Sequence, residues 1–277
     1  MLPQCNKHAP AAGTPFFSLR LGSCIVEPMN SDTSPSWPYP RWIAHRGAGQ
    51  LAPENTLAAF RMGAANGYRM FECDAKLSAD GVVFLMHDAT LERTTNGQGP
   101  SAARAWSALS QLDAGSWHSS RFAGEPLATL ADLATFCLAN AYHLNIEIKP
   151  SPGAEALTGK AVARLAATLW QQAPVPPLLT SFNTEALSAA QSAAPELPRG
   201  LLLDTLWDGW LSSAQDLGCV AVVCHYPLWH ATNVAQVHSA GMKCLSYTVN
   251  DRGEAQRLID LGTDGIVTDR VDLFSPT

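Results

Sequence analysis

Three short apolar segments of the sequence each carry two charged residues of the kinds that bind anions, metal ions or protons. These pairs are His45 and Arg46, Glu72 and Asp74, and Glu147 and Lys149. Each pair follows or interrupts residues that would form a buried strand, and an unpaired charge in a protein interior is strongly unfavourable. We therefore expect these side chains to contact one another or a ligand.

The second pair points to a metal ion. In the strand expected at 70–77, Glu72 and Asp74 lie on one face, because successive side chains of a strand point to opposite faces. Two buried carboxylates repel each other unless one is protonated or a cation lies between them. A divalent ion such as Mg²⁺ or Ca²⁺ meets this need, since both ions bind carboxylate oxygens. The alternative is a polar strand face in contact with solvent.

A histidine is expected beside these two carboxylates. If Asp80 and Gly81 are the central residues of a hairpin turn, the strand expected at 82–87 returns antiparallel to its predecessor. His87 then falls opposite Asp74 and on the same face. A shift of one residue in this pairing would move His87 to the other face.

The third pair has two interpretations. Glu147 and Lys149 share a face of the strand expected at 143–149, and a simple ion pair is one of them. We prefer a third metal carboxylate beside a cation for an anionic ligand, because the strand is otherwise apolar. A metal ion, Arg46 and Lys149 in one place favour an anion such as phosphate. Two histidines add a general acid and a general base, so the predicted chemistry is metal-assisted phosphoryl transfer or hydrolysis.

The elements that must position these residues form a repeating pattern. Short β-branched runs alternate with amphipathic stretches of helical length, which is typical of βα units and a parallel sheet. Strands are expected at 41–46, 70–77, 82–87, 143–149, 177–182, 199–204, 219–225, 243–249 and 264–268. Helices are expected at 53–66, 130–141, 157–172, 183–194, 207–217, 230–240 and 251–261.

These elements predict the fold class. The link before 82–87 is too short to join two parallel strands, so that strand belongs to a hairpin. The others predict an α/β fold, a (β/α)₈ TIM barrel, whose sites form where strands end. We expect this domain to span 37–277, with an insertion at about 90–128.

The composition excludes several classes of protein. The 277 residues are 47% hydrophobic and 15% charged with a net charge of −6, which is typical of a globular protein. No basic run favours nucleic acid or a stable membrane association. Seven scattered cysteines favour free thiols and a cytoplasmic location. Residues 1–36 are rich in proline and lack periodicity, so we expect a disordered or irregular arm, with Met29 as an alternative start.

Seven motifs, in order along the chain, resemble those of the glycerophosphodiester phosphodiesterase family in its short cytosolic bacterial form. They are His45-Arg46-Gly47, Pro53-Glu54-Asn55-Thr56, Glu72-x-Asp74, Asp80-Gly81, His87-Asp88, Glu147-Ile148-Lys149 and Thr248-Val249-Asn250. The resemblance extends from about Trp37 to the C-terminus. It implies a TIM barrel with a small insertion after the second histidine motif.

The resemblance also implies a role for each matching residue. It implies one divalent cation, Mg²⁺ or Ca²⁺, on Glu72, Asp74 and Glu147, acid–base catalysis by His45 and His87, and a grip on phosphate by Arg46 and Lys149. Glu54 is expected to brace the site, and Phe182 to form an apolar wall for glycerol. Tyr247 is expected to line the pocket, although many relatives carry Trp there.

The implied substrates are glycerophosphodiesters, such as glycerophosphocholine and glycerophosphoethanolamine, which are cut to sn-glycerol 3-phosphate and an alcohol. By analogy, the glycerol 2-hydroxyl attacks phosphorus to give a cyclic phosphate, which water then opens. We assign His45 as the base and His87 as the acid. Asp264 and Asp269 are expected to be capping or loop residues outside the metal site.

Two other functions stay open. One is a phosphodiesterase of the same barrel type that acts on lipid head groups, although the sequence shows no basic amphipathic helix for membrane docking. The other is a protein that binds phosphodiesters without cleaving them, although none of the expected metal and acid–base residues is missing. The native metal, the preferred head group and the oligomeric state also stay open.

Overall fold

The computed structural model describes residues 37–276. The arm expected over 1–36, the alternative start at Met29, and the residues Cys5 and Cys24 lie outside the described residues. The cysteines in the described part are buried free thiols: Cys73, Cys137, Cys219, Cys224 and Cys244. Within the same part of the chain, no helix has the length and apolar character needed to cross a membrane.

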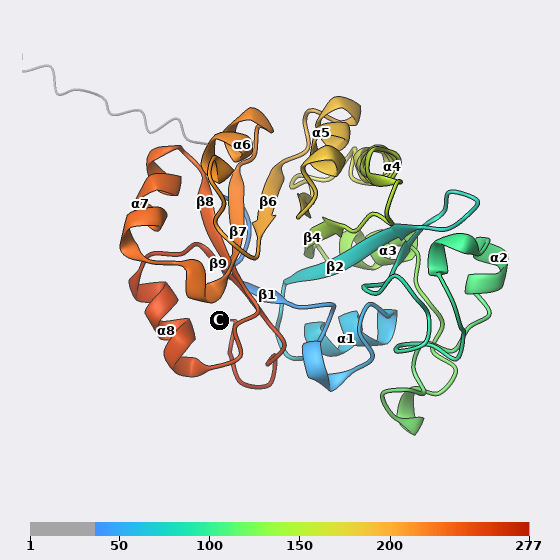
Figure 1. The fold of residues 1–277 in the computed structure, drawn as a ribbon. Helices are drawn as coiled ribbons and strands as arrows, with labels where there is room; N and C mark the ends of the chain where they lie inside the picture. The colour runs from blue at the N-terminus through green and yellow to red at the C-terminus, as the bar shows by residue number, and fades with distance from the viewer. Residues whose placement is uncertain (1–36, 277) are drawn as a thin grey trace, which may run out of the picture. The chain divides into compact units, whose positions relative to one another are not determined.

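Nine strands form one sheet in the described residues, and eight of them close into a parallel barrel (Figure 1). The strands are β1 (Trp42–Ala44), β2 (Met70–Leu77), β3 (Val83–Leu85), β4 (His143–Ile148), β5 (Leu178–Ser181), β6 (Arg199–Leu203), β7 (Ala221–His225), β8 (Lys243–Tyr247) and β9 (Gly265–Thr268). Their order is β1-β9-β8-β7-β6-β5-β4-β2-β3, and a pairing of β1 with β2 closes the barrel. The predicted (β/α)₈ barrel with an extra hairpin strand is confirmed.

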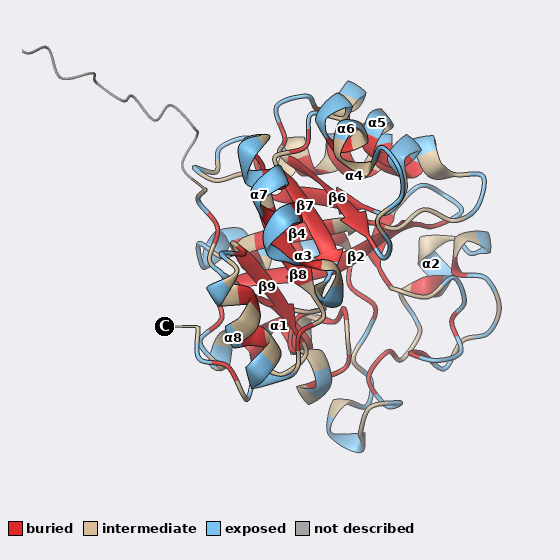
Figure 2. Cartoon of the chain, turned by 60° about the vertical axis from the view of Figure 1, so that its left-hand side comes forward, coloured by how far each residue is buried: buried red, intermediate tan, exposed pale blue. Residues whose placement is uncertain are grey.

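Helices cover the outside of the barrel. They are α1 (Leu57–Ala65), α3 (Leu130–Ala139), α4 (Glu155–Leu169), α5 (Thr184–Ala193), α6 (Trp210–Asp216), α7 (Ala231–Ser239) and α8 (Arg252–Asp260). Their buried residues face the strands and their polar residues face outward (Figure 2). Side-chain caps define several of their first turns, such as the capping box of Thr129 and Asp132 on α3.

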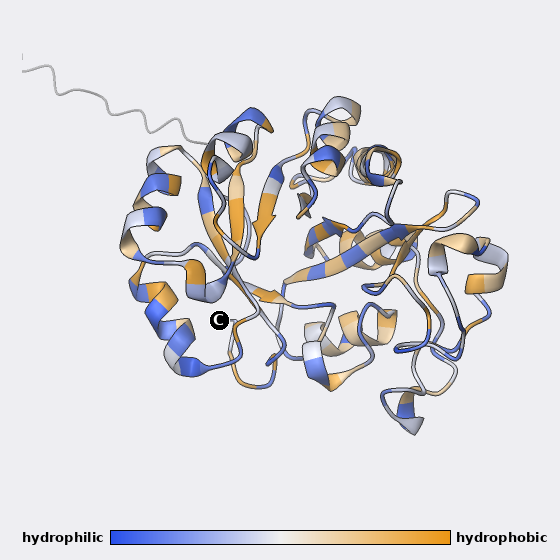
Figure 3. Cartoon of the chain, in the orientation of Figure 1, coloured by the Kyte–Doolittle hydropathy of each residue, from blue (hydrophilic) through white to orange (hydrophobic). Residues whose placement is uncertain are grey.

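The interior of the barrel is apolar at one end and charged at the other. Ile43, Met70, Leu202, Val223 and Val267, from five different strands, belong to one buried cluster. Because side chains alternate along a strand, residues 72 and 74 follow Met70 on the same inward face. Figure 3 shows the polar positions that interrupt the apolar length of β2. The carboxylates therefore lie above a packed core, at the end where the βα loops begin.

The β2–β3 hairpin differs from the predicted register by one residue. Ala75 pairs with Leu85, and Ser78 N donates to Val82 O, so the loop has three residues instead of two. Gly81 takes a positive φ of 83° in this loop, which is typical of a three-residue hairpin with a bulge. The expected pairing of His87 with Asp74 is therefore wrong. His87 lies beyond the end of β3, where the strand register no longer sets its direction.

The chain between β3 and α3 forms a small unit beside β2. It contains two 3-10 turns, η2 (Ser101–Ala103) and η3 (Ser120–Phe122), and the short helix α2 (Trp106–Leu109). Its apolar side chains pack with Phe84 of β3 in a separate cluster, which also includes Met86, Leu91, Leu109, Ala114 and Leu127. Figure 1 shows α2 on the β2 side of the barrel, away from α7 and α8.

Candidate active site

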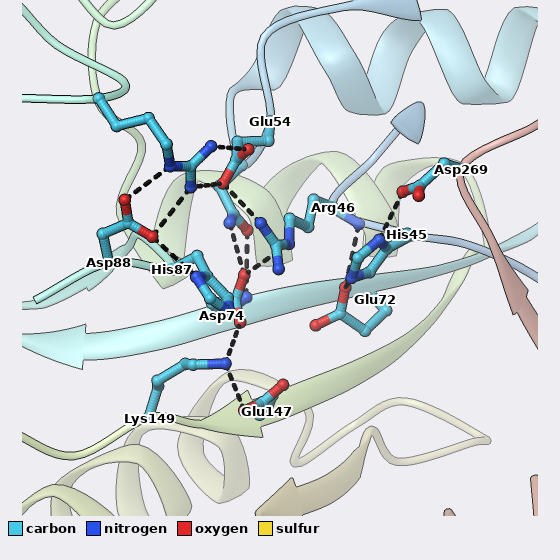
Figure 4. Close-up of polar contacts among 12 residues, drawn as sticks. His45, Arg46, Glu54, Glu72, Asp74, His87, Asp88, Glu147, Lys149 and Asp269 are labelled. Carbon is cyan, nitrogen blue, oxygen red and sulfur yellow. Dashed lines mark hydrogen bonds and ion pairs between the residues drawn. The ribbon is translucent and has the colours of Figure 1, made fainter. Parts of the chain in front are cut away.

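The barrel register places His45 between two carboxylates. Ala44 is paired with both β2 and β9, so the next residue lies beside Glu72 on one side and Asp269 on the other. His45 Nδ1 is 2.6 Å from Asp269 Oδ1, and Nε2 is 3.8 Å from Glu72 Oε2 (Figure 4). Burial alone would lower the pKa of His45, but the hydrogen bond with Asp269 and the charge of Glu72 raise it above its usual value.

Glu72, Asp74 and Glu147 form a cluster at the mouth of the barrel. Asp74 and Glu147 are direct neighbours in the β2–β4 register. One oxygen atom from each carboxylate lies within 4.8 Å of the other two. Burial and the charge of Asp74 raise the pKa of Glu72 to about 8, and the same two causes raise the pKa of Glu147. Without a cation, Glu72 and Glu147 therefore take up protons more readily than free carboxylates do.

Asp74 is the carboxylate with the strongest cationic surroundings. Arg46 Nε lies 3.3 Å from its Oδ2, and Lys149 Nζ lies 3.2 Å from its Oδ1. Burial would raise the pKa of Asp74, but these two cations hold it well below its usual value. Asn55 Nδ2 donates to Asp74 Oδ2 at 2.8 Å and Asn55 Oδ1 accepts from Asp74 N at 3.1 Å, which fixes the side chain.

The cluster fits a hard divalent cation. Within residues 37–276, the buried Oε1 of Glu72 has no hydrogen-bond partner, and Oδ1 of Asp74 has the ion pair with Lys149 but no hydrogen bond. Buried oxygens without donors are costly, and a cation satisfies them. A Mg²⁺ or Ca²⁺ ion would also remove the repulsion among the three carboxylates. Glu72, Asp74 and Glu147 are therefore a suitable donor set.

Arg46 has an unusual backbone conformation, and its main chain and side chain are both held by carboxylates of the site. Arg46 has a φ of 50°, which non-glycine residues rarely adopt and which occurs at functional sites. Its backbone N donates to Glu72 Oε2 at 3.0 Å, and its Nη1 donates to Glu54 Oε1 at 2.8 Å. The next residue, Gly47, has no room for a side chain, since a Cβ there would lie 2.8 Å from Ala59.

His87 reaches the cluster from the β3 side. Its Nδ1 lies 2.9 Å from Asp88 Oδ1, and burial lowers the pKa of His87. Arg93 joins this pair to the other half of the site, because it donates to Asp88 at 2.6 Å and to both oxygens of Glu54 at 2.7 Å. Glu54 in turn bonds Arg46, so one network of ion pairs supports both histidine motifs.

A cavity of about 180 Å³ lies at the centre of these groups. Its lining includes eight of the ten residues predicted for the site: His45, Arg46, Glu72, His87, Glu147, Lys149, Phe182 and Tyr247. Asp74 and Glu54 lie behind Arg46 and pair with it. Phe182 and Tyr247 meet edge to face at 5.7 Å and form an apolar part of the cavity wall.

Three residues of the site were not predicted from the sequence. Asp269, expected to be a capping or loop residue, contacts His45, and Asp88 and Arg93 were assigned no role. The position of Asp269 directly after the last strand could have predicted this contact, because the last strand must lie beside β1 in a closed barrel. Asp264, by contrast, lies at the opposite end of β9, where it accepts a hydrogen bond from the backbone N of Cys244 and pairs with His238 and Lys243.

The chain is similar over most of its length to known phosphodiesterases. The model of the glycerophosphoryl diester phosphodiesterase family matches residues 45–273. A glycerophosphodiester phosphodiesterase of Caldanaerobacter subterraneus is 31% identical over 82% of this chain and 93% of that protein. The structure of an Oleispira antarctica phosphodiesterase in complex with the product sn-glycerol-3-phosphate is 33% identical, with a TM-score of 0.78 over 83% of this chain and 93% of that one.

A second solved structure agrees with the first. It is a glycerophosphodiester phosphodiesterase of Agrobacterium tumefaciens, 28% identical, with a TM-score of 0.72 over 86% of this chain and all of that chain (100%). The match of the family model includes both histidines, the three clustered carboxylates and Lys149. The chain therefore belongs to the glycerophosphoryl diester phosphodiesterase family and is a phosphodiesterase.

Proposed function

We propose that this enzyme hydrolyses glycerophosphodiesters, such as glycerophosphocholine and glycerophosphoethanolamine, to sn-glycerol 3-phosphate and an alcohol, with one Mg²⁺ or Ca²⁺ ion and two acid–base histidines. The observation that carries the proposal is the gathering of a three-carboxylate cluster, two His–Asp pairs, Arg46 and Lys149 around one small cavity. The Oleispira relative with bound sn-glycerol-3-phosphate supports the same product.

Glu72, Asp74 and Glu147 would hold the divalent ion. When bound, this ion offsets negative charge on the phosphoryl oxygens. Arg46 and Lys149 are placed to bind the same oxygens, since both already lie within 3.3 Å of Asp74 at the edge of the cluster. The guanidinium of Arg46 is fixed by Glu54, so it meets the phosphate without reordering.

Two histidines complete the reaction. One accepts the proton of the glycerol 2-hydroxyl as its oxygen attacks phosphorus, and the other donates a proton to the alcohol oxygen as the bond between phosphorus and that oxygen breaks. Water then opens the cyclic phosphate with the same groups in reversed roles. Each imidazole is held by a carboxylate on Nδ1, which leaves Nε2 for proton transfer. The order assigned from the sequence, His45 as base and His87 as acid, stays a prediction.

The apolar wall accounts for recognition of the glycerol unit. Phe182 and Tyr247 enclose one side of the 180 Å³ cavity, and the Tyr247 hydroxyl donates to Leu203 O at 3.0 Å, which fixes the ring. A three-carbon chain suits such a space. The cytoplasmic location and the residues 37–277 as one catalytic domain also stay predictions.

The test is an assay of purified protein with Mg²⁺ or Ca²⁺ on glycerophosphocholine, glycerophosphoethanolamine and intact lipid vesicles. We expect release of sn-glycerol 3-phosphate from the water-soluble diesters. Cleavage of the vesicle lipids alone would instead favour the lipid head-group phosphodiesterase. Binding of the diesters without release of product would favour the non-catalytic binding protein.

Replacement of Asp269 tests how the site holds His45. We expect Asp269→Asn to lower kcat about 100-fold with a small change in KM, because the asparagine no longer fixes the imidazole tautomer. The hydrogen bond with Asp269 raises the pKa of His45, so its loss should also move the His45 limb of the pH–rate profile to lower pH. The matched control is Asp264→Asn at the other end of β9, which should leave kcat and the profile unchanged. Equal effects of both substitutions would contradict this role.

A further inference from the structure

A larger cavity adjoins the active site on the far side of His45. It has a volume of about 460 Å³, against about 180 Å³ for the cavity at the carboxylates, and both are lined by His45 and Arg46. Its remaining wall includes Glu54 and three residues of the segment between β3 and α3, which are Arg93, Trp117 and His118. The two cavities share His45, proposed for proton transfer, and Arg46, proposed for phosphate binding, so a diester held by these residues would extend into both.

The wall contributed by this segment is held in place. His118 Nε2 lies 3.1 Å from the backbone O of Gln50 in the loop after β1. Glu125 Oε1 accepts a hydrogen bond from the backbone N of Ala58, in the first turn of α1, at 2.9 Å. Arg93 bonds Glu54 through two nitrogens. The cavity is therefore bounded by contacts between the segment and the barrel.

Trp117 is a partly exposed aromatic residue in the lining of this cavity. Its indole N–H already donates to Ala114 O at 2.8 Å, yet the residue remains 40% exposed. A ring whose polar atom is satisfied can still pack against the C–H face of an aliphatic ring or chain. The same ring could attract an ammonium group, so the charges nearby decide which ligand fits.

Those charges disfavour a cation. Both carboxylates that line the cavity already have cationic partners, since Glu54 pairs with Arg46 and Arg93, and Asp269 pairs with His45. The guanidinium groups of Arg46 and Arg93 are balanced in the same way, so the lining has no excess negative charge that would attract a quaternary ammonium. A neutral alcohol with several hydroxyls suits this lining, because each carboxylate oxygen has two lone pairs, so Glu54 can accept a further hydrogen bond from a hydroxyl, and the hydroxyl oxygen can accept one from a guanidinium N–H.

We propose that this cavity receives the alcohol part of the diester, and that Trp117 favours neutral polyhydroxyl alcohols, such as a second glycerol or a cyclitol, over quaternary ammonium alcohols. This inference rests on the proposed diester hydrolysis and adds the class of leaving alcohol. The smaller cavity, with its apolar wall, then holds the glycerol that becomes sn-glycerol 3-phosphate.

The test compares kcat and KM for glycerophosphoglycerol, glycerophosphoinositol and glycerophosphocholine in the wild type, Trp117→Ala, Trp117→Phe and Trp207→Ala. Trp207 is a matched control, because it is also 40% exposed and lines neither cavity. We expect the wild type to prefer the two polyol diesters. Trp117→Ala should lower kcat/KM for them about tenfold, mainly through KM, and change that for glycerophosphocholine less than about twofold. Trp117→Phe should restore most of the loss, and Trp207→Ala should match the wild type.

Other outcomes overturn the inference in distinguishable ways. An equal loss on all three substrates, with a lowered unfolding temperature, would make Trp117 a structural residue. No loss on any substrate, or a wild-type preference for glycerophosphocholine, would show that this cavity does not select the alcohol. Absence of hydrolysis of every diester by the wild type would reject the proposed function together with the inference.

Discussion

Chelation of divalent cations is expected to lower the rate of diester hydrolysis by about 1000-fold or more, and added Mg²⁺ or Ca²⁺ should restore it. Without a cation, the clustered carboxylates Glu72, Asp74 and Glu147 repel an anionic phosphate and one another. The measurement is the initial rate after chelator treatment and metal add-back. Full activity in the chelated protein would contradict the metal site.

The same cluster predicts how the stability of the metal-free protein depends on pH. Burial and Asp74 raise the folded-state pKa of Glu72 to about 8, well above its value in the unfolded chain. A group with a raised folded pKa binds protons more tightly when folded, so its contribution is present at low pH and lost as the pH rises through about 8. The pKa of Glu147 is also raised, so this residue too contributes stability that is lost as the pH rises.

Metal binding should reverse this trend, and thermal unfolding can show it without an activity assay. At about 100 times the dissociation constant, a ligand of the folded state adds about 2.7 kcal/mol, which corresponds to roughly 5–10 °C for a domain of this size. We expect the metal to raise the unfolding temperature more at pH 8 than at pH 5. Glu72→Gln is the control, because it should weaken both the pH dependence of the metal-free protein and the shift caused by Mg²⁺. Equal metal shifts at both pH values in wild type and variant would contradict this account.

The barrel could be predicted because its evidence is local. The inward face of β2 reads Met70, Glu72 and Asp74, and period-two alternation was enough to separate these residues from Phe71 and Cys73 on the outer face. The turn after β2 was also recognised, but its type was not. The loop before Val82 has one residue more than predicted, which shifts the β2–β3 register by one residue. His87 lines the site because it lies beyond Leu85, where strand pairing no longer sets the direction of the side chain.

The contacts that hold the catalytic groups could not be predicted in the same way. His45 and Asp269 are 224 positions apart and meet because β9 lies beside β1, which follows from closure of the barrel and from no local pattern. Arg93 lies in an irregular segment, where neither helical nor strand periodicity indicates which partner it reaches. The larger cavity has the same origin, since it forms where this segment meets the loop after β1.

Replacement of either histidine is expected to lower the rate on natural diesters by about 100- to 10,000-fold, and the leaving group should reveal which histidine is the acid. His45 lines both cavities, whereas His87 lines the smaller one and is not among the residues around the larger one. If the alcohol lies in the larger cavity, His45 is the group beside the departing oxygen. His87 then accepts the proton of the glycerol 2-hydroxyl, which is the reverse of the order assigned from the sequence.

A glycerophosphodiester with p-nitrophenol as its alcohol separates the two orders, because p-nitrophenolate departs without a proton from the enzyme. We expect this substrate to restore most of the rate lost in His45→Ala and little of that lost in His87→Ala. The measurement is the ratio of kcat/KM for the p-nitrophenyl diester to that for glycerophosphoglycerol in each variant. Rescue of His87→Ala alone would mean that His87 is the acid and His45 is the base, with the alcohol bound beside His87. Rescue of neither variant would mean that protonation of the alcohol oxygen by a histidine does not limit the reaction.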